Sequence, residues 1–209
     1  MKKGVSIVGI GTDVGKTVVS AIFSEALSAC YFKPIQAGDL DNTDSMTVDQ
    51  LTSDHVEIAP ELFRLQIPMA PHGAAKIDGV EMRLSDLELP QTERLIVLEG
   101  AGGLMVPLNE YHETFLDVYK KAALPVVIVS RHYLGSINHT LLTMDRLKSE
   151  GLKIAGIVFV GDENTVTEAI IERNTGVQQL ARIPWTETLN PEFVKKQSEK
   201  LKGLVYELS

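Results

Sequence analysis

The stretch Gly9-Ile10-Gly11-Thr12-Asp13-Val14-Gly15-Lys16-Thr17 decides the fold of this chain. It follows an apolar run, Val5–Ile10, which predicts a buried strand, and it opens an amphipathic stretch, Lys16–Ala29, which predicts a helix. A glycine-rich segment that joins a strand to a helix and ends in Gly-Lys-Thr is typical of a phosphate-binding loop. Five residues separate Gly9 from Gly15, one more than in the common form of that loop. We therefore expect nucleotide binding here.

The chemistry of such a loop follows from its residues. Glycines let successive backbone N–H groups converge on phosphate oxygens. Lys16 is placed to reach the β- and γ-phosphates, and Thr17 is placed to offer its hydroxyl to Mg²⁺.

The remaining strands and helices alternate along the chain. Apolar runs rich in β-branched residues predict strands at Tyr31–Ile35, Leu95–Glu99, Val126–Ser130 and Ile154–Val160. Amphipathic stretches predict helices at Thr114–Ala123, Ser136–Glu150, Thr165–Arg173 and Pro191–Lys202. Runs that are apolar at nearly every position indicate strands covered on both faces. We predict an α/β, P-loop NTPase-like fold with a mostly parallel sheet and helices on both faces.

The less periodic stretch from Ala37 to Pro90 predicts a long excursion over the carboxyl edge of the sheet, not a separate domain. The length of 209 residues, 44% of them apolar and 23% charged, suits a single domain spanning residues 1–209. The one cysteine, Cys30, cannot form an internal disulfide, which favours a reducing compartment.

The charge and hydropathy of the chain exclude two classes of partner. A net charge of −8 argues against general nucleic-acid binding. No apolar run approaches the roughly 18 residues that a membrane-spanning helix needs. We expect a cytoplasmic protein with neither a nucleic-acid nor a membrane partner.

Charged residues at the ends of two predicted strands suit phosphate chemistry. Glu99 ends an apolar strand, where a carboxylate is costly unless it is paired, so it predicts a Mg²⁺ ligand or a phosphate-facing acid. The glycines that follow, at Gly100, Gly102 and Gly103, would also suit a simple tight turn. Lys33 ends another strand and is placed to face the same triphosphate as Lys16.

Two other segments are ambiguous from the residues alone. Asp44 lies in an acidic stretch without Lys or Arg between Lys33 and Arg64, and a solvated loop accounts for most of its acids. The segment Gly135–Asn138 opens a predicted helix, where it could bind an anion or simply hold an ordinary Ser N-cap.

Taken together, these motifs resemble the dethiobiotin synthetase family of biotin biosynthesis. The resemblance covers most of the chain, and the order and spacing of its parts are more specific than any single part. The matching segments are Gly9–Thr17, Lys33-Pro34-Ile35, Asn42-Thr43-Asp44, Ala70-Pro71-His72, Glu99–Gly103, Leu134–His139 and Ile183-Pro184-Trp185.

The resemblance implies a ligase that uses Mg²⁺ and ATP to close a ring on 7,8-diaminononanoate with CO₂, which gives dethiobiotin, ADP and phosphate. One amine captures CO₂ as a carbamate, whose oxygen attacks the γ-phosphate to form a carbamic–phosphoric anhydride. The second amine then displaces phosphate and closes a cyclic urea.

The resemblance also implies the site residues. Lys16 and Lys33 would be catalytic, and Thr17, Asp44 and Glu99 would hold Mg²⁺. The substrate would meet Ala37 and, at a helix N-terminus supplied by the second subunit of a homodimer, Gly135, Ser136, Ile137 and Asn138. ATP would be bound by Thr12, Asp13, Val14, Gly15, Lys16, Thr17, Val18, Glu99, Gly100, Ala101, Gly102, Pro184, Trp185, Thr186 and Glu187.

Four residues depart from the family pattern. Asp13 stands where Glu is frequent, Ala37 where a hydroxyl residue is usual, and Tyr133 where Lys can precede Leu-Gly. These three changes bear on the affinity of the site for its ligands. Val160 stands where the family usually has an Asn that reads the adenine edge, so this change bears on base selectivity.

Two other classes of protein share this style of loop. Amidoligases of the cobyrinic acid diamide synthase kind usually carry a glutaminase domain with a nucleophilic Cys, for which a chain of 209 residues with one cysteine leaves no room. Partition-type ATPases, which act as nucleotide switches, usually show a second lysine early in the loop. Here that region reads Gly11-Thr12-Asp13, which makes the switch the alternative function.

Overall fold

The computed structural model describes residues 3–205, in which seven parallel strands form the central sheet. Their order is β4-β2-β6-β1-β7-β8-β9. The strands are β1 (Gly4–Gly9), β2 (Cys30–Phe32), β4 (Glu57–Ile58), β6 (Ile96–Gly103), β7 (Val126–Arg131), β8 (Ile154–Val160) and β9 (Gln179–Ile183). Because all pairs are parallel, the carboxyl ends of the strands meet at one edge, where open α/β sheets bind ligands.

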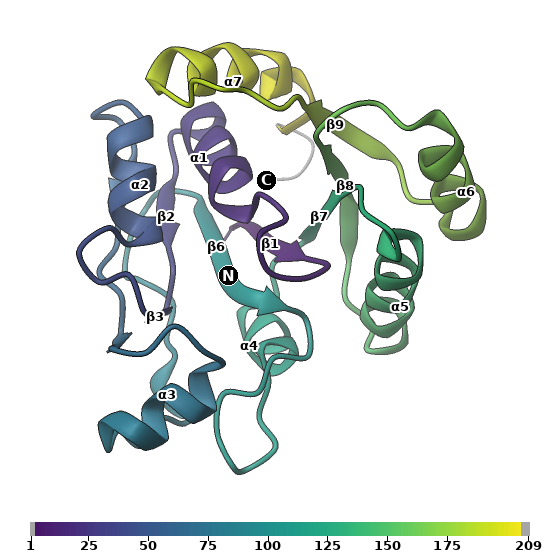
Figure 1. Cartoon of the computed structure of the whole chain (residues 1–209). Coiled ribbons are helices and arrows are strands. Elements are labelled where there is room, and N and C mark those ends of the chain that lie inside the picture. Colours follow the sequence, from purple (N-terminus) through teal and green to yellow (C-terminus); the bar gives the residue numbers. More distant parts are fainter. Residues whose placement is uncertain (1–2, 206–209) are drawn as a thin grey trace.

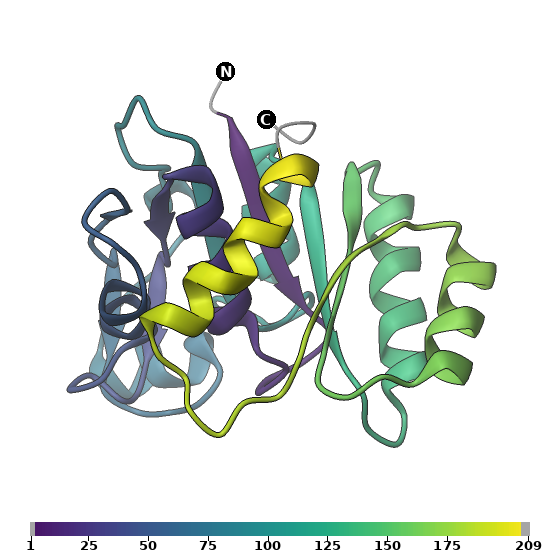
Figure 2. The same ribbon diagram turned by 90° about the horizontal axis from the view of Figure 1, so that it is seen from above.

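Helices cover both faces of this sheet (Figure 1). Helices α1 and α7 lie on one face, α4 and α5 lie on the other, and α6 packs against α5. Figure 2 shows α7 crossing over α1 and the central strand. The helices are α1 (Lys16–Leu27), α2 (Asp44–Leu51), α3 (Pro71–Asp78), α4 (Phe115–Ala122), α5 (Ser136–Ser149), α6 (Thr165–Thr175) and α7 (Pro191–Val205), with a short 3₁₀ helix, η1 (Leu84–Asp86). The predicted fold class is confirmed.

The central strands are apolar because both of their faces are covered. Every residue of β1 is buried, and Ile7 and Val8 have no exposed surface. Burying one such side chain stabilises the fold by roughly 1.5–3 kcal/mol. Within residues 3–205, no helix combines the length and the apolar character needed to cross a membrane.

The prediction of one strand over Tyr31–Ile35 is wrong. β2 ends at Phe32, and β3 (Ile35–Ala37) leaves the main sheet to pair with β5 (Phe63–Leu65) in a separate two-stranded sheet. The break falls at Lys33-Pro34, where proline has no N–H to donate to a ladder. This turn positions Lys33 at the carboxyl edge.

The stretch from Ala37 to Pro90 is more regular than the sequence suggested. It contains α2 and α3, the short strands β4 and β5, and η1. The edge strand β9 was also not predicted, because its residues Gln179, Ala181 and Arg182 are only half-buried and break the apolar run. The other predicted elements are present, and β8 has the predicted bounds.

Candidate active site

A cavity of about 820 Å³ opens at the carboxyl edge of the sheet. The phosphate loop, the ends of β2, β6, β7 and β8, and the loop after β9 all contribute to its wall. Its lining residues are Thr12, Asp13, Gly15, Lys16, Thr17, Val18, Lys33, Gln36, Ala37, Asp39, Asn42, Asp44, Pro68, Met69, Ala70, Pro71, Glu99, Ala101, Gly102, Val106, Arg131, Val160 and Trp185. Site residues predicted at the ends of β1, β2 and β6 are thus gathered around one space, together with Trp185 after β9.

The phosphate loop joins β1 to α1 through two residues in the left-handed region. Asp13 has φ 55°, and Gly15, which precedes the first residue of α1, has φ 93°. Glycine adopts such a φ without strain, which explains its place here. No side chain caps the helix, so its N-terminal N–H groups remain available to an anion.

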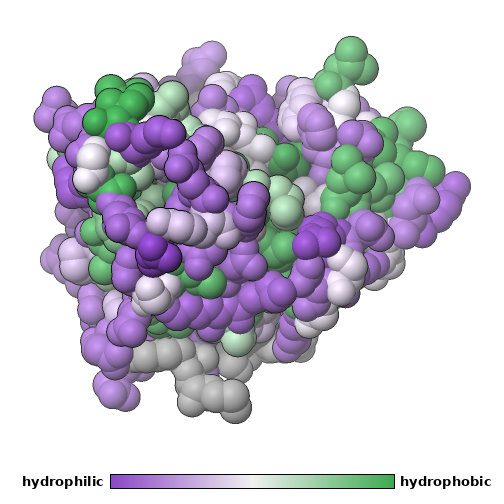
Figure 3. Space-filling model, turned by 90° about the horizontal axis from the view of Figure 1, so that it is seen from below, coloured by the Kyte–Doolittle hydropathy of each residue, from purple (hydrophilic) through white to green (hydrophobic). Residues whose placement is uncertain are grey.

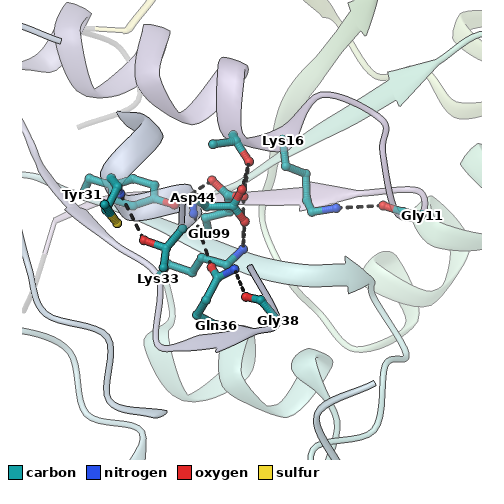
Figure 4. Close-up of polar contacts among 11 residues, drawn as sticks. Gly11, Lys16, Tyr31, Lys33, Gln36, Gly38, Asp44 and Glu99 are labelled. Atoms are coloured by element: carbon teal, nitrogen blue, oxygen red, sulfur yellow. Dashed lines mark hydrogen bonds and ion pairs between the residues drawn. The ribbon is translucent and has the colours of Figure 1, made fainter. Parts of the chain in front are cut away.

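The ammonium of Lys16 folds back onto its own loop. Its Nζ donates to the carbonyl oxygen of Gly11 at 2.8 Å and points away from the acidic cluster (Figure 4). Burial lowers the pKa of Lys16 to about 8, although the nearby Glu99 carboxylate opposes that shift. A partly desolvated cation in this place favours a negatively charged ligand.

Three oxygen-bearing side chains converge beside the loop. The Oγ1 atom of Thr17 lies 2.8 Å from Oδ1 of Asp44 and 3.1 Å from Oε1 of Glu99. Asp44 is positioned as the first residue of α2, whose N-cap Thr43 accepts a hydrogen bond from the N–H of Met46. Glu99 is completely buried at the carboxyl half of β6.

Lys33 pairs with both carboxylates. Its Nζ lies 2.5 Å from Oδ2 of Asp44 and 3.4 Å from Oε1 of Glu99. Burial alone would lower the pKa of Lys33, but the two carboxylates outweigh it and raise that pKa. Burial likewise disfavours the charged form of Asp44, and Lys33 overcomes this and lowers the pKa of that carboxyl. The pair is therefore ionised.

Two tyrosines, Tyr31 and Tyr119, pack beside the strand that carries Glu99. The hydroxyl of Tyr31 donates to Oε2 of Glu99 at 3.0 Å, and burial raises the pKa of this phenol. The ring of Tyr119 packs under Gly100, where an added Cβ would lie 2.0 Å from its hydroxyl. Gly100 is therefore explained by packing and need not contact a ligand.

The far end of the cavity is built from strand ends in register. Arg131 pairs with Val160, and Val160 pairs with Ile183, two residues before Trp185. The Cζ atom of Arg131 lies 4.9 Å from the centre of the Trp185 ring, and its guanidinium donates to the carbonyl oxygen of Asp13 at 3.3 Å. An exposed aromatic ring beside an apolar Val160 provides a stacking surface.

Comparisons with known proteins identify the family. A family model described as "AAA domain" matches residues 3–193. An ATP-dependent dethiobiotin synthetase, BioD, from Christiangramia forsetii is 48% identical over 209 residues, which cover 100% of both chains. The chain belongs to the dethiobiotin synthetase family. It is an ATP-dependent ligase, a cyclo-ligase of biotin biosynthesis, with a P-loop fold.

Solved structures with low sequence identity share the fold of this dethiobiotin synthetase family member. The cell division ATPase MinD of Pyrococcus furiosus superposes with a TM-score of 0.62 at 17% identity, over 98% of this chain and 100% of that chain. A plasmid partition protein from Borrelia burgdorferi also gives a TM-score of 0.62, at 11% identity, over 99% of this chain and 100% of its own. At such identities the likeness concerns architecture alone.

Some residues that the dethiobiotin synthetase pattern implies do not line the cavity. Among the ATP-binding candidates these are Val14, Gly100, Pro184, Thr186 and Glu187. Val14 is buried, and the hydroxyl of Thr186 is engaged with the backbone of Thr188. Their contact with ATP stays a prediction.

The predicted carboxylate site lies outside this cavity. Gly135–Asn138 form the start of α5, whose N-cap Gly135 has φ 103° and no side-chain cap. The preceding Leu134 is fully exposed. Gly135–Asn138 therefore do not line the cavity beside the phosphate loop.

Several cavity residues were not singled out as site residues from the sequence. Gln36, Asp39, Asn42 and Arg131 line the wall. Gln36 is buried, donates to the carbonyl of Gly38 at 2.9 Å and accepts from the N–H of Asp44 at 3.4 Å. The signal for Gln36 was its position after Lys33-Pro34, but nothing in the sequence alone indicated the stacking of Arg131 on Trp185.

The oxygens of Thr17, Asp44 and Glu99 suit Mg²⁺. Within residues 3–205, no group of three or more His, Cys, Asp or Glu side chains forms a protein cage for a metal. Mg²⁺ in nucleotide enzymes typically takes one or two carboxylates and completes its shell with phosphates and water. Two carboxylates and a hydroxyl beside a phosphate loop fit that requirement.

Proposed function

We propose that this ligase carries out Mg-ATP-dependent carboxylation and ring closure of 7,8-diaminononanoate with CO₂ to dethiobiotin, ADP and phosphate. The observation that carries the proposal is the meeting of Lys33 with Asp44 and Glu99 beside the phosphate loop, with Lys16 on the same cavity wall. Membership in the dethiobiotin synthetase family supports this reaction, and these residues would supply the charges that phosphoryl transfer requires.

The proposed reaction has three steps. One neutral amine attacks CO₂ and loses a proton, which gives a carbamate. A carbamate oxygen attacks the γ-phosphorus, the bond to the β,γ-bridging oxygen breaks, and ADP leaves. The second amine attacks the carbamoyl carbon of the anhydride, phosphate leaves with the bonding electrons, and a proton is released as the cyclic urea forms.

Thr17, Asp44 and Glu99 would hold Mg²⁺, which supplies positive charge to the nucleotide phosphates. Lys33 is the counter-ion to the same carboxylates in the structure. With those carboxylates holding Mg²⁺, the ammonium of Lys33 would be available to the transferring phosphoryl group and the carbamate. Lys33 would therefore act only once metal and nucleotide are both in place.

Lys16 would bind the β- and γ-phosphates. Its present partner, the carbonyl of Gly11, is a neutral acceptor, whereas a phosphate oxygen forms a stronger charge-assisted hydrogen bond. When Lys16 leaves Gly11 for a phosphate, the loop loses one hydrogen bond and the partly buried site gains an ion pair.

Substrate binding is proposed to need two subunits. Ala37 lies on the cavity wall, where the diamine would pass. Gly135–Asn138, which would bind the substrate carboxylate, do not line the cavity of the same subunit. A homodimer that seats the start of α5 over its partner's cavity would complete the site.

The surface beside α5 supports such an interface. An apolar groove of about 380 Å³ lies between α5 and the segment after β6. Leu142 and Met105 are exposed along it, and Leu134 is exposed just before the start of α5. Figure 3 shows hydrophobic residues gathered on the same side of the molecule as α5 and α6. Exposed apolar patches of this kind mark interaction sites.

Diamine-dependent release of ADP tests the proposed function against a nucleotide switch. Purified protein with Mg-ATP and bicarbonate should form ADP only when 7,8-diaminononanoate is added. Steady hydrolysis without the diamine, stimulated by DNA or by membrane, would favour the partition-type ATPase.

A further inference from the structure

The carboxylate of Glu99 is held from two sides. Its Oε1 faces Thr17 and Lys33, at 3.1 and 3.4 Å, whereas its Oε2 accepts a hydrogen bond from the hydroxyl of Tyr31 at 3.0 Å (Figure 4). Neither Glu99 nor Tyr31 has exposed surface. The hydroxyl of Tyr31 therefore donates to the carboxylate oxygen of Glu99 that does not face Thr17 and Lys33.

The sheet register explains why this tyrosine reaches Glu99. Tyr31 on β2 pairs with Val97 on β6, and Glu99 lies two residues further along β6. Residues two apart on a strand point to the same face, so the tyrosine ring and the carboxylate share one side of the sheet. Lys33, two residues beyond Tyr31, follows the turn at the end of the same strand.

A buried carboxylate without a donor on one oxygen is free to rotate. Rotation would turn Oε1 away from Thr17. A hydrogen bond to Oε2 fixes the torsion of the carboxylate and so keeps Oε1 directed at Thr17. Outer residues that orient a metal ligand in this way contribute to metal affinity without touching the metal.

We propose that Tyr31 is a positioning residue that fixes Glu99 as a metal ligand. The inference rests on the proposed role of Glu99 in holding the divalent cation. Tyr31 itself contacts neither the metal nor the nucleotide. Its ring packs in the core, and its hydroxyl alone carries the proposed effect.

The Tyr31→Phe variant removes that hydroxyl and keeps the ring. Mn²⁺ is the probe, and its binding in the presence of ADP is followed by the electron paramagnetic resonance signal of free Mn²⁺. We expect Tyr31→Phe to raise the Mn²⁺ dissociation constant roughly tenfold, as the loss of an outer-shell partner typically does. ADP affinity measured without a divalent cation should stay unchanged, which separates metal positioning from a general weakening of the site.

Tyr119→Phe is the matched control. Tyr119 is also buried and lies under the next residue of the same strand, but its hydroxyl meets the backbone of Gly100. We expect it to keep wild-type Mn²⁺ affinity. Thermal unfolding of both variants shows whether they fold equally well.

The outcomes separate the two proposals. Glu99→Gln should weaken Mn²⁺ binding at least as much as Tyr31→Phe. If Glu99→Gln weakens binding and folded Tyr31→Phe does not, the positioning role is overturned while the metal role stands. If Glu99→Gln leaves Mn²⁺ affinity unchanged, the metal role fails and the role of Tyr31 fails with it. An equal loss of Mn²⁺ affinity in Tyr31→Phe and Tyr119→Phe also overturns the proposal, because removing any buried hydroxyl near Glu99 would then weaken metal binding.

Discussion

The Nζ atom of Lys33 lies 2.5 Å from Oδ2 of Asp44, so a buried cation and a carboxylate neutralise each other at the mouth of the phosphate loop. Only 4% of the Lys33 side chain is exposed, against 35% for Asp44. Water can therefore reach the carboxylate of Asp44 more easily than the ammonium of Lys33. A divalent cation that enters with ATP would meet a carboxylate held ready and a lysine able to move toward the phosphates.

Lys33→Ala should abolish ring closure while the chain still folds. Removing one cation from a water-poor phosphoryl site lowers turnover by roughly 10²–10³-fold. Turnover at saturating ATP and diamine measures this, with circular dichroism to confirm folding. Lys76→Ala is the control, because Lys76 pairs with Glu110 in an exposed ion pair that lies outside the cavity. Near-normal turnover of Lys33→Ala would remove Lys33 from the mechanism.

Two inactive variants should restore each other if the site is shared between subunits. Lys16→Ala disables the phosphate loop, and Asn138→Asp places a negative charge where the substrate carboxylate is proposed to bind. A mixed dimer would contain one intact site, so random exchange should recover about a quarter of wild-type turnover. If mixed dimers form, as native mass spectrometry can show, and no activity returns, the shared site is wrong.

The enzyme should accept several nucleoside triphosphates. Val160 offers no hydrogen bond to a base, and Asn164 downstream already accepts from the N–H of Thr167 to cap α6. An apolar site discriminates weakly, so we expect ATP to exceed GTP or CTP by about tenfold or less in kcat/KM.

The Val160→Asn variant tests the cause of that weak selectivity. An added donor and acceptor beside the base should increase the preference for ATP, whereas Val160→Leu should not. Turnover efficiency with each triphosphate at fixed diamine decides the matter. A roughly thousandfold preference for ATP in the wild type would contradict relaxed base selectivity.

Glu168 should stabilise the fold in a pH-dependent way. Its buried carboxylate receives hydrogen bonds from Arg182 at 2.5 Å, from His132 at 2.8 Å and from the N–H of Asn164 at 3.1 Å. Burial would raise the pKa of Glu168, but these partners outweigh it and lower that pKa. A carboxyl whose folded-state pKa is depressed contributes stability above its unfolded pKa and loses it as pH falls through the folded value.

Urea unfolding of Glu168→Gln measures that contribution. We expect a loss of about 2–4 kcal/mol at pH 7, because Arg182 loses its buried carboxylate partner and keeps only the exposed Glu163, at 3.5 Å. The difference from the wild type should shrink as pH falls below about 4.3, the ordinary pKa of a glutamate in an unfolded chain, and should be smallest once pH is below the lowered pKa of the folded state. A difference that stays constant from neutral to acidic pH would show that the charge of Glu168 is not its cause.

The parallel sheet and the residues at its carboxyl edge could be predicted because both follow from local pattern. Apolar runs locate β1, β6, β7 and β8, and parallel strands end together, so Lys16 and Glu99 had to lie near each other. The bend at Lys33-Pro34 could not be predicted from the apolar pattern, because apolar residues lie on both sides of it. Only the pairing of β3 with β5 outside the main sheet shows where the strand breaks.

Other parts of the site depend on packing between distant segments. Asp44 reaches Thr17 because α2 starts beside the phosphate loop. The acidic stretch around Asp44 does not by itself indicate which of its carboxylates faces the loop. The contact of Arg131 with Trp185 joins the ends of β7 and β9, which no local spacing relates. The hydrogen bond from Tyr31 to Glu99 likewise requires the register of β2 on β6.

Incorporation of label from bicarbonate into a cyclic urea tests the central claim most directly. The purified protein is incubated with 7,8-diaminononanoate, ¹⁴C-labelled bicarbonate and Mg-ATP, and the products are separated and counted. Label should appear in dethiobiotin, in equal amount to the ADP released, and Lys33→Ala should form it roughly 10²–10³-fold more slowly. ADP release without label in a cyclic urea would contradict the proposed carboxylation and ring closure.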